Sequence, residues 1–312
     1  MESQAASDVL MVRLVRFAGN IETEASNRFQ TRDRSVSAAH AQAAAVAEFD
    51  ELARRLQTAG VTVHTVDDTH EPHTPDSIFP NNWVSFHADG AVVLYPMLAP
   101  NRRLERRDDV LATLSAERGF RINRVIDLTA HEHGGRFLEG TGSLVLDRVH
   151  RLAYACVSPR TDLDVLGDFA QQLDYDVISF EAHDAQGAAI YHTNVLMCVG
   201  ARFAAVCVES IREQERAGVL DALRTTGHPV LELTLAQMGE FAGNMLELKT
   251  ASGETMVAMS SRAHAALTAA QRDFLSEHSG AVVTSDIPTI ETLGGGSVRC
   301  MLAEIHLPRK SN

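Results

Sequence analysis

The chain has 312 residues, of which 45% are hydrophobic and 22% are charged, and both fractions are ordinary for a globular protein. Its 41 acidic and 28 basic residues give a formal net charge of -13. This acidity argues against a nucleic-acid partner, because a nucleic-acid-binding face is basic. No apolar run approaches the ~20 residues of a membrane span, so we expect no membrane partner.

The N-terminal residues 1–8 lack a basic region followed by an apolar stretch, and we therefore expect no signal peptide. The four cysteines show neither CxxC pairing nor the spacing of zinc ligands. Few cysteines in such a chain predict reduced thiols and a cytoplasmic protein. We expect three of them to be inert apolar residues, namely Cys156, Cys198 and Cys207.

Helical patterns recur along the chain, and each is followed by a strand-like run. The first ends at Gly60, the second is predicted from Leu104 to Arg118, and the third from Leu163 to Leu173. Glycine is common just past a helix C-terminus because it adopts the left-handed conformation without a Cβ clash. The second pattern ends at such a glycine, Gly119, whereas Asp174 ends the third.

Two further helices open with capping-box patterns, in which a Ser or Thr is followed three residues later by Glu or Gln. Ser210 with Glu213 opens the fourth helix, and Thr268 with Gln271 opens the fifth. The successive helix ends, the last two of which are Gly227 and Gly280, lie 53 to 59 residues apart.

A short apolar run that turns back on itself also recurs, at intervals of roughly 50 to 60 residues. The five runs begin at Asn82-Trp83-Val84, Gly142-Ser143-Leu144, Asn194-Val195-Leu196, Asn244-Met245-Leu246 and Ser297-Val298-Arg299.

Each unit therefore consists of a hairpin, a helix and a strand. A doubly wound parallel sheet also alternates strands with helices, but it seldom carries a two-stranded ribbon in every unit. We predict an α/β fold, a five-bladed α/β propeller of pseudo-repeated units that spans residues 1–312 as a single catalytic domain. Equivalent positions of such repeats meet at the centre of the fold.

Three reactive residue types stand at or near equivalent places of the repeat. They are Glu139, His192 and Cys300. Taken alone, a late cysteine is more often a buried structural residue, and a lone histidine more often a satisfied structural group. Together, a carboxylate, a histidine and a cysteine are the parts of a nucleophilic hydrolase. The glycine run 294–296 before the cysteine offers free N–H groups to a ligand or an oxyanion.

Other candidates carry weaker signals. Arg102 and Arg160 follow strands and are suited to bidentate pairing with a substrate carboxylate. His131-Glu132-His133 offers a pair of metal ligands, but no third ligand stands at a convincing spacing. No Gly-x-Ser-x-Gly elbow for a serine nucleophile is present.

At these residues the chain resembles the guanidino-group-modifying superfamily, the pentein enzymes that include amidinotransferases, arginine deiminase and dimethylarginine dimethylaminohydrolase. The resemblance runs through most of the chain and is carried by the segments 75–82, 137–140, 158–161 and 192–194 and by Cys300. Within the superfamily, the citrulline-utilisation hydrolase branch is the most similar, through the segments 17–20, 79–82 and 241–244.

The chain departs from the arginine-directed members at two positions. Those members place acids where this chain has Asn82 and, in the deiminases, where it has Asn194. A guanidinium is a planar cation that is gripped by carboxylates, and each lost charge-assisted hydrogen bond costs about 1.5–3 kcal/mol. An asparagine instead both donates to and accepts from a neutral ureido group. The substitutions favour citrulline as the substrate.

The resemblance implies a covalent mechanism that needs no metal and no organic cofactor. Cys300 attacks the ureido carbon, His192 protonates the departing nitrogen and then activates water, and the products are ornithine, carbon dioxide and ammonia. The implied substrate contacts are as follows: Glu139 and Asn82 orient the ureido nitrogens, Arg102 and Arg160 hold the α-carboxylate, Asp76 takes the α-ammonium, and Asn194, Phe17 and the backbone at Gly294 adjoin the pocket.

Two alternatives stay open. An arginine or methylarginine hydrolase of the deiminase type would use the same residues and give citrulline. A non-catalytic propeller that acts as a binding module is the alternative from another class, although the residues Cys300, His192 and Glu139 disfavour it. The expected partner is a small amino-acid substrate. The sequence leaves open a homodimer and a lid formed by residues 182–189.

Overall fold

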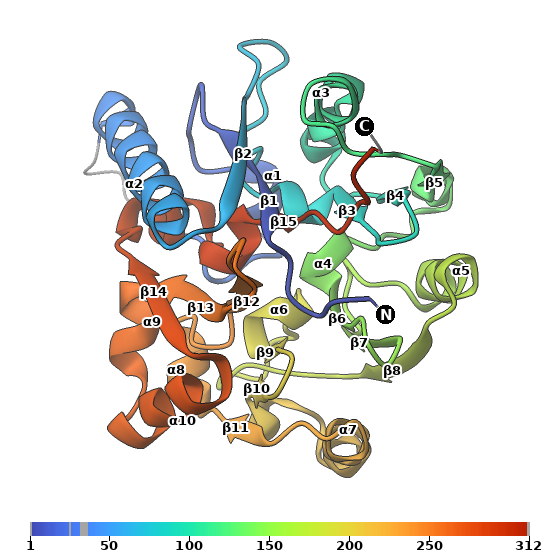
Figure 1. Cartoon of the computed structure of the whole chain (residues 1–312), viewed down its shortest axis with the longest axis vertical. Helices are drawn as coiled ribbons and strands as arrows, with labels where there is room; N and C mark the ends of the chain where they lie inside the picture. The colour runs from blue at the N-terminus through green and yellow to red at the C-terminus, as the bar shows by residue number, and fades with distance from the viewer. Residues whose placement is uncertain (1, 25, 32–36, 311–312) are drawn as a thin grey trace.

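Five three-stranded β-sheets surround a common centre, and the longer helices lie outside them (Figure 1). A computed structural model of the protein describes residues 2–24, 26–31 and 37–310. The first sheet consists of β3 (Val84–Phe86), β4 (Ala91–Leu94) and β5 (Arg124–Asp127), and the second of β6 (Leu144–Asp147), β7 (Leu152–Cys156) and β8 (Asp176–Phe180). The third consists of β9 (Met197–Val199), β10 (Ala204–Val206) and β11 (Val230–Glu232), and the fourth of β12 (Leu246–Lys249), β13 (Thr255–Ser260) and β14 (Ala281–Ser285). The fifth consists of β15 (Ala303–Glu304), β1 (Asp8–Arg13) and β2 (Thr62–Asp67).

All five sheets share one topology. The middle strand pairs antiparallel with the strand on one side and parallel with the strand on the other. A helix joins the two parallel strands of each sheet, as a parallel pair requires. These connecting helices are α3 (Asp108–Ala116), α5 (Leu163–Leu173), α7 (Glu213–Thr225), α10 (Ala269–Ser279) and α2 (Ala38–Thr58). The sheets fit the five pseudo-repeats predicted from the sequence.

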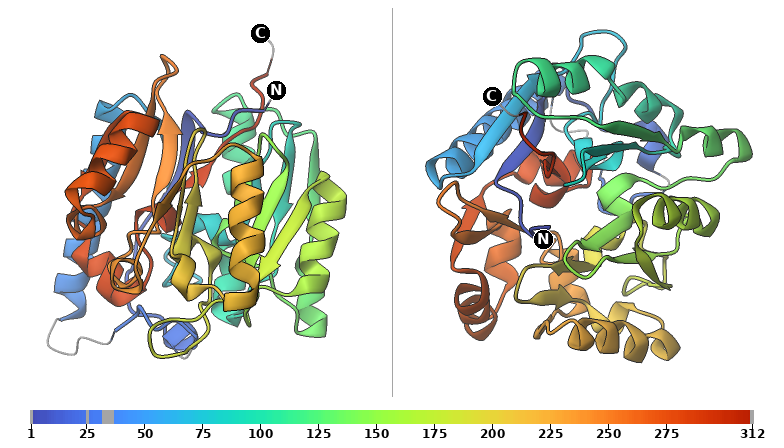
Figure 2. Two further views of the ribbon diagram at one scale, coloured as in Figure 1. Left: turned by 90° about the horizontal axis from the view of Figure 1, so that it is seen from below. Right: turned by 45° about the vertical axis from the view of Figure 1, so that its right-hand side comes forward.

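The short helices are α1 (Ile21–Glu24), α4 (Gly140–Ser143), α6 (Thr193–Leu196), α8 (Leu235–Gly239) and α9 (Ser261–Ala266). Three of them, α4, α6 and α8, lie between the five units, whereas α1 and α9 each precede the connecting helix within a unit. The side view in Figure 2 shows the long helices flanking the strands, with α1 beyond one end of the sheets. Within the described residues, no helix is long and apolar enough to cross a membrane.

The fifth unit differs from the prediction because it is assembled from both ends of the chain. The run that begins at Ser297 does not turn back on itself. It forms a 3-10 helix, Val298–Met301, and continues into β15. This strand pairs antiparallel with β1, where Val9 lies opposite Glu304. The N-terminal strand therefore supplies the return strand of the last hairpin.

The predicted helix ends are confirmed. The four glycines at positions 60, 119, 227 and 280 all have positive φ angles, between 73° and 97°. Asp174 ends α5 in the same left-handed region, with φ 56°. Thr268 and Gln271 form both hydrogen bonds of the predicted capping box of α10.

Two predicted helix starts are wrong. The segment from Leu104 to Arg118 is not one helix, because Arg106 and Arg107 are extended and separate a 3-10 helix, Pro100–Glu105, from α3. Ser210 does not cap α7, since its hydroxyl donates to the Cys207 carbonyl at 2.6 Å. The residue before α7 is Arg212, which makes no side-chain cap.

The core fills the space between the sheets and the outer helices. On α2, Phe49, Leu52 and Leu56 are buried on one face and pack with Val9 and Met11 of β1. A comparable cluster joins Phe169 of α5 to the second sheet. Each helix is therefore held by its apolar face, at ~25 cal/mol for each Å² of apolar surface removed from water.

The end of α7 provides a matched test of backbone conformation. Gly227 has φ 81° and Gly218 lies within α7, and a Cβ at either position would meet no atom within 4 Å. We expect Gly227→Ala to lower the free energy of unfolding by about 1 kcal/mol through left-handed strain. Gly218→Ala should raise it by about 0.5–1 kcal/mol. Urea denaturation of both variants measures the difference, and equal effects would contradict the assignment.

Candidate active site

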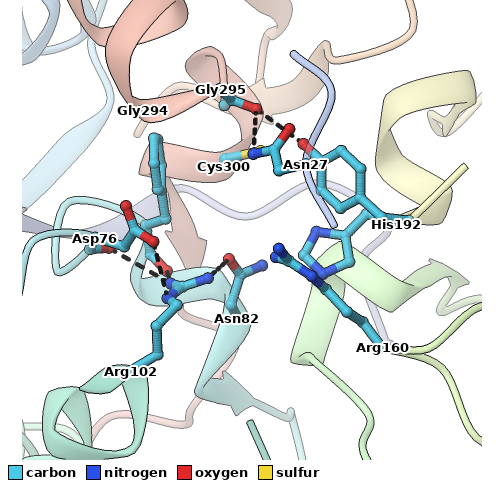
Figure 3. Close-up of a pocket in the computed structure, with 12 residues that line it drawn as sticks. Asn27, Asp76, Asn82, Arg102, Arg160, His192, Gly294, Gly295 and Cys300 are labelled. Atoms are coloured by element: carbon cyan, nitrogen blue, oxygen red, sulfur yellow. Dashed lines mark hydrogen bonds and ion pairs between the residues drawn. The ribbon is translucent and has the colours of Figure 1, made fainter. Parts of the chain in front are cut away.

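The segments that precede the first strands of several sheets converge on one small cavity (Figure 3). It is lined by twelve residues: Asn27, Asp76, Phe79, Asn82, Arg102, Arg160, Tyr191, His192, Gly294, Gly295, Gly296 and Cys300. The sequence brings these residues together because each belongs to the equivalent end of its own repeat.

Glu139 and His192 form a buried pair behind the cavity. The Nε2 atom of His192 lies 2.9 Å from Oε2 of Glu139. Glu139 is fully buried and precedes α4, and His192 is 2% exposed and precedes α6. Since α4 and α6 lead into neighbouring sheets, the repeat itself places the acid against the imidazole.

Burial and charge set the protonation of this pair. Burial lowers the pKa of His192 to about 4, even though the hydrogen bond to Glu139 acts in the opposite direction. Burial alone would raise the pKa of Glu139, but the charge of Arg160 and the hydrogen bond from His192 outweigh it and bring the pKa well below its usual range. The resting pair is thus a carboxylate and a neutral imidazole, and the imidazole is ready to accept a proton.

Arg160 completes the surroundings of Glu139. Its Nη1 lies 3.2 Å from Oε2 of Glu139, and its Nη2 donates to the Ser26 hydroxyl at 2.6 Å. The guanidinium also lies over the ring of Tyr191, 5.0 Å from its centroid. A buried carboxylate with a fixed cation is retained in its ionised form, which keeps His192 oriented.

Cys300 lies in the 3-10 helix before β15 and is 4% exposed. Two side-chain amides point at its sulfur: Nδ2 of Asn194 at 3.5 Å and Nδ2 of Asn244 at 3.3 Å. Asn244 is itself fixed, because its Oδ1 accepts from the backbone N–H of Arg299 at 3.1 Å. Amide donors directed at sulfur are suited to stabilising a thiolate.

Asn82 and Asp76 lie on the other side of the cavity and are held by Arg102 (Figure 3). Nη1 of Arg102 donates to Oδ1 of Asn82 at 2.8 Å, and its Nε lies 3.7 Å from Oδ2 of Asp76. Glu105 binds Nε and Nη2 of the same guanidinium, each at 2.9 Å. Asn20 donates to Oδ2 of Asp76 at 2.7 Å.

Three buried polar atoms have no hydrogen-bond partner within the described part of the chain and lie on residues at the cavity. They are Oδ1 of Asp76, Nδ2 of Asn82 and Oδ1 of Asn194. A buried polar atom without a partner costs about 1–3 kcal/mol. A ligand that offers one acceptor and two donor groups would satisfy all three.

Gly142 makes the close approach across the centre possible. A Cβ at this position would lie 2.4 Å from Nδ2 of Asn82 and 2.7 Å from Nδ1 of His192. Real Cβ atoms essentially never come so near to other atoms, so only glycine lets both side chains occupy these places. The same measurement shows that the Asn82 amide nitrogen and the His192 ring face one region.

Most of the predicted site residues meet at this cavity. Gly294 lines it, but Phe17 does not, because it lies behind Gly294 with its ring edge 3.7 Å from where a Cβ would stand. Asn194 does not line the cavity, but its side-chain amide contacts the sulfur of Cys300, which does.

Asn244, Tyr191 and Asn27 are at the site but were given no role from the sequence. Asn244 was placed at a repeat start and in the segment 241–244, and its equivalence to Asn194 was the signal that would have identified it. Tyr191 donates its hydroxyl to the Gly295 carbonyl at 2.8 Å. Asn27 donates to the same carbonyl at 3.1 Å, and no motif around it indicates this contact.

The remaining cysteines lie elsewhere and are buried. Burial raises the pKa of Cys156 and of Cys198 to about 12, so both stay protonated, in agreement with the prediction of inert thiols. His131 pairs with Asp168 at 2.6 Å and His133 with the Ala130 carbonyl, so these two histidines do not face a common ligand.

Comparison with known proteins agrees with this geometry. A family model described as N,N dimethylarginine dimethylhydrolase, eukaryotic, matches residues 13–307. No curated protein matches the chain.

Solved structures share the fold at low sequence identity. The apo structure of ArgZ, an arginine dihydrolase from the ornithine-ammonia cycle in cyanobacteria, has a TM-score of 0.74 and 18% identity; the match covers 97% of this chain and 41% of that one. Unliganded AgrE has a TM-score of 0.73 and 18% identity; the match covers 98% of this chain and 40% of the AgrE chain. A dimethylarginine dimethylaminohydrolase adduct with S-methyl-L-thiocitrulline has a TM-score of 0.65 and 14% identity; the match covers 98% of this chain and 100% of that one. The chain thus spans about two fifths of the full ArgZ and AgrE chains.

The lowered pKa of His192 predicts its titration. Because burial shifts the pKa down to about 4, the ring should bind a proton only as the pH falls towards that value. We expect the ring NMR signals of His192, assigned by their loss in His192→Gln, to stay those of neutral imidazole from about pH 8 to 5. Signals that titrate near pH 6.5 would show that Glu139 outweighs burial.

Proposed function

Because the chain belongs to the N,N dimethylarginine dimethylhydrolase family of the guanidino-group-modifying pentein superfamily, we propose that it is a cysteine-dependent hydrolase that cleaves the ureido group of citrulline. We further propose that residues 1–312 act as one catalytic domain. The N-terminal domain of ArgZ, of which 99% is covered by the match, has the same extent.

The observation that carries the choice of substrate is the fixed orientation of the Asn82 amide. Its Oδ1 accepts from Arg102, which has only donors, so its Nδ2 must point the other way. That nitrogen lies in the region of His192 and has no partner among the described residues. A donor at this place matches the oxygen of a ureido group, whereas a guanidinium presents only N–H groups.

The rest of the cavity suits the two charged groups of an amino acid. Oδ1 of Asp76 is a buried acceptor available to an α-ammonium. Arg102 and Arg160 each keep one Nη1 proton that no hydrogen bond uses within the described chain. These protons are available to an α-carboxylate. Internal carboxylates already fix both guanidiniums, so little entropy is lost when the substrate binds.

The chemistry follows from the arrangement of Cys300, His192 and Glu139. Neutral His192 takes the thiol proton of Cys300, and the resulting imidazolium is stabilised by Glu139. The thiolate attacks the ureido carbon. Its hydrogen bonds from the amides of Asn194 and Asn244 break as the new carbon–sulfur bond forms. His192 then protonates the departing nitrogen, which leaves as the amine of ornithine. A carbamoyl thioester remains on Cys300.

The second half of the reaction restores the enzyme. His192, neutral again, activates a water molecule that attacks the thioester carbon. The carbon–sulfur bond breaks, the thiol regains its proton, and the released carbamate decomposes to carbon dioxide and ammonia. Every proton moves through one imidazole, which explains why its tautomer is fixed by a buried carboxylate.

A hydrolase of arginine or methylarginine is the second candidate. The observation that favours it is charge: the buried carboxylate of Asp76 shares Arg102 with Glu105, and its Oδ1 has no hydrogen-bond partner within the described chain. A cationic substrate would neutralise this carboxylate. The names of the similar structures also refer to arginine.

Product analysis distinguishes the candidates. The purified protein with citrulline should yield ornithine and ammonia, measured by chromatography of the amino acids, and Cys300→Ser should lose roughly 10³-fold or more of the rate. The thermal unfolding of Cys300→Ser serves as its control for folding. Accumulation of citrulline from arginine would instead establish the second candidate, and no turnover of any of these compounds would support the binding module.

Replacement of Asn82 by Asp tests the amide directly. The retained Oδ1 still accepts from Arg102, but a carboxylate oxygen now faces the ureido oxygen. We expect kcat/KM for citrulline to fall about 10- to 100-fold, since a charged group is left unpaired. The ratio of kcat/KM for arginine over citrulline should rise at least tenfold (about 1.4 kcal/mol). Because both substrates are assayed on one protein, misfolding cannot produce the change, and an unaltered ratio would refute the role of Nδ2.

A further inference from the structure

A second cluster of ligating side chains lies at the far end of the second sheet. Asp147 is the last residue of β6, and His150 follows it in the turn to β7. His228 comes from the loop between α7 and β11. One carboxylate oxygen and one nitrogen of each histidine lie within 4.8 Å of one another. No other such group of three is found within the described ranges of the chain.

Both histidines direct the same ring atom at the carboxylate. Nδ1 of His150 lies 2.9 Å from Oδ2 of Asp147, and Nδ1 of His228 lies 3.8 Å from the same oxygen. A tetrahedral zinc ion with bonds of about 2.1 Å requires ligand atoms roughly 3.4 Å apart. The first separation is shorter than that value and the second is longer, and the two imidazole nitrogens lie within 4.8 Å of each other, so the three side chains would adjust around a bound ion.

The tautomer of His228 already suits a metal ligand. Its Nε2 lies 3.1 Å from the Gly200 carbonyl oxygen, which only accepts, so Nε2 carries the proton and Nδ1 presents a lone pair. A ligating histidine typically donates its other N–H to a backbone carbonyl or carboxylate in this way. In this structure the hydrogen-bond partner of Nδ1 of His228 is the Thr226 hydroxyl, at 2.8 Å.

The charge of the cluster is the second observation that points to a cation. Asp147 is only 1% exposed, yet its ion-pair partners within the described chain are the two histidines, with no lysine or arginine. A buried carboxylate is costly unless a cation or several donors accompany it. The backbone N–H of His150 supplies one donor at 2.9 Å. A hydrogen-bonded turn explains that contact, but it does not explain why a buried histidine from another sheet faces the same carboxylate.

We propose that Asp147, His150 and His228 form a binding site for a first-row divalent metal ion of the zinc class, separate from the catalytic cavity. Two imidazoles and a carboxylate are a donor set that such ions prefer. His150 is the exposed member, with 42% of its side chain accessible, and it gives an ion access to the buried carboxylate.

The position of the site indicates a structural role. Asp147 ends β6, and the first residue of this strand adjoins the catalytic loop, so the length of the strand, roughly 10 Å at ~3.3 Å per residue, lies between the two sites. The ion would connect the β6–β7 turn to the α7–β11 loop, and so the second sheet to the third. An ion that binds only the folded chain stabilises it.

Zinc binding to the full chain tests the proposal. The catalytic thiol is first removed by Cys300→Ser, so that zinc at the active site does not contribute. After treatment with a chelator, equilibrium dialysis against Zn²⁺ should load about one ion per chain and raise the melting temperature. Adding His150→Gln should weaken the affinity at least tenfold and abolish the thermal shift, which is measured for each variant from its own metal-free melting temperature.

A matched control and a second probe make the result specific. His133→Gln replaces an exposed histidine that bonds only a backbone carbonyl, and it should leave zinc binding unchanged. Co²⁺ bound to the Cys300→Ser protein should show visible absorption that disappears in the His150→Gln variant. The absence of zinc binding, or binding that survives His150→Gln, would overturn the proposal and leave the cluster a hydrogen-bonded turn.

Discussion

The pairing of β15 with β1 is the constraint on which the site depends. Val9 and Leu10 lie opposite Glu304 and Ala303, and β1 is at the same time paired with β2 along its whole length. Cys300 stands three residues before β15, in a short 3-10 helix. The nucleophile is therefore placed by contacts between the two ends of the chain. Any change that loosens this sheet would displace the sulfur from the imidazole, which belongs to the third unit.

The second constraint is electrostatic. Glu139 is fully buried, and three donors bind it: His192, Arg160 and the backbone N–H of Leu98 at 3.1 Å. Burying these charges contributes little to stability, because the loss of hydration offsets most of their attraction. What the arrangement provides is preorganisation, since donors and charges are already oriented when the imidazolium develops. Burial of these charges therefore costs free energy on folding, but the site needs little reorganisation during the reaction.

The sequence predicted the helix ends well, because they depend on local conformation. Helix ends at Gly227 and Gly280 follow from the left-handed conformation that the chain must adopt there. The repeat then placed Glu139, His192 and Cys300 at equivalent positions, and the cavity brings His192 and Cys300 together with Glu139 directly behind. Here periodicity was informative because it relates distant segments without requiring knowledge of their contacts.

The sequence did not reveal contacts between residues far apart in the chain, nor a local hydrogen bond that competes with a predicted helix cap. The pairing of β1 with β15 has no local signal, so the fifth unit was expected to contain its own hairpin. Ser210 satisfies its hydroxyl within the preceding turn, and this competing hydrogen bond removes the capping box that the spacing suggested. Likewise, Asn27 reaches Gly295 across 268 positions, and only the folded chain shows that it lines the cavity.

The polarity of the cavity relates the two asparagine substitutions to the choice of substrate. Its unused donor, Nδ2 of Asn82, lies by His192, whereas an unused acceptor belongs to Asp76, beside Arg102. The carboxylate of Glu139 already accepts hydrogen bonds from three donors, so it has little remaining capacity to bind a substrate guanidinium. A carboxylate oxygen without a partner within the described chain thus belongs to Asp76, whose other oxygen is held by Asn20 and Arg102. A molecule with an oxygen at its reacting end and a cation at its other end matches this polarity, and citrulline has both.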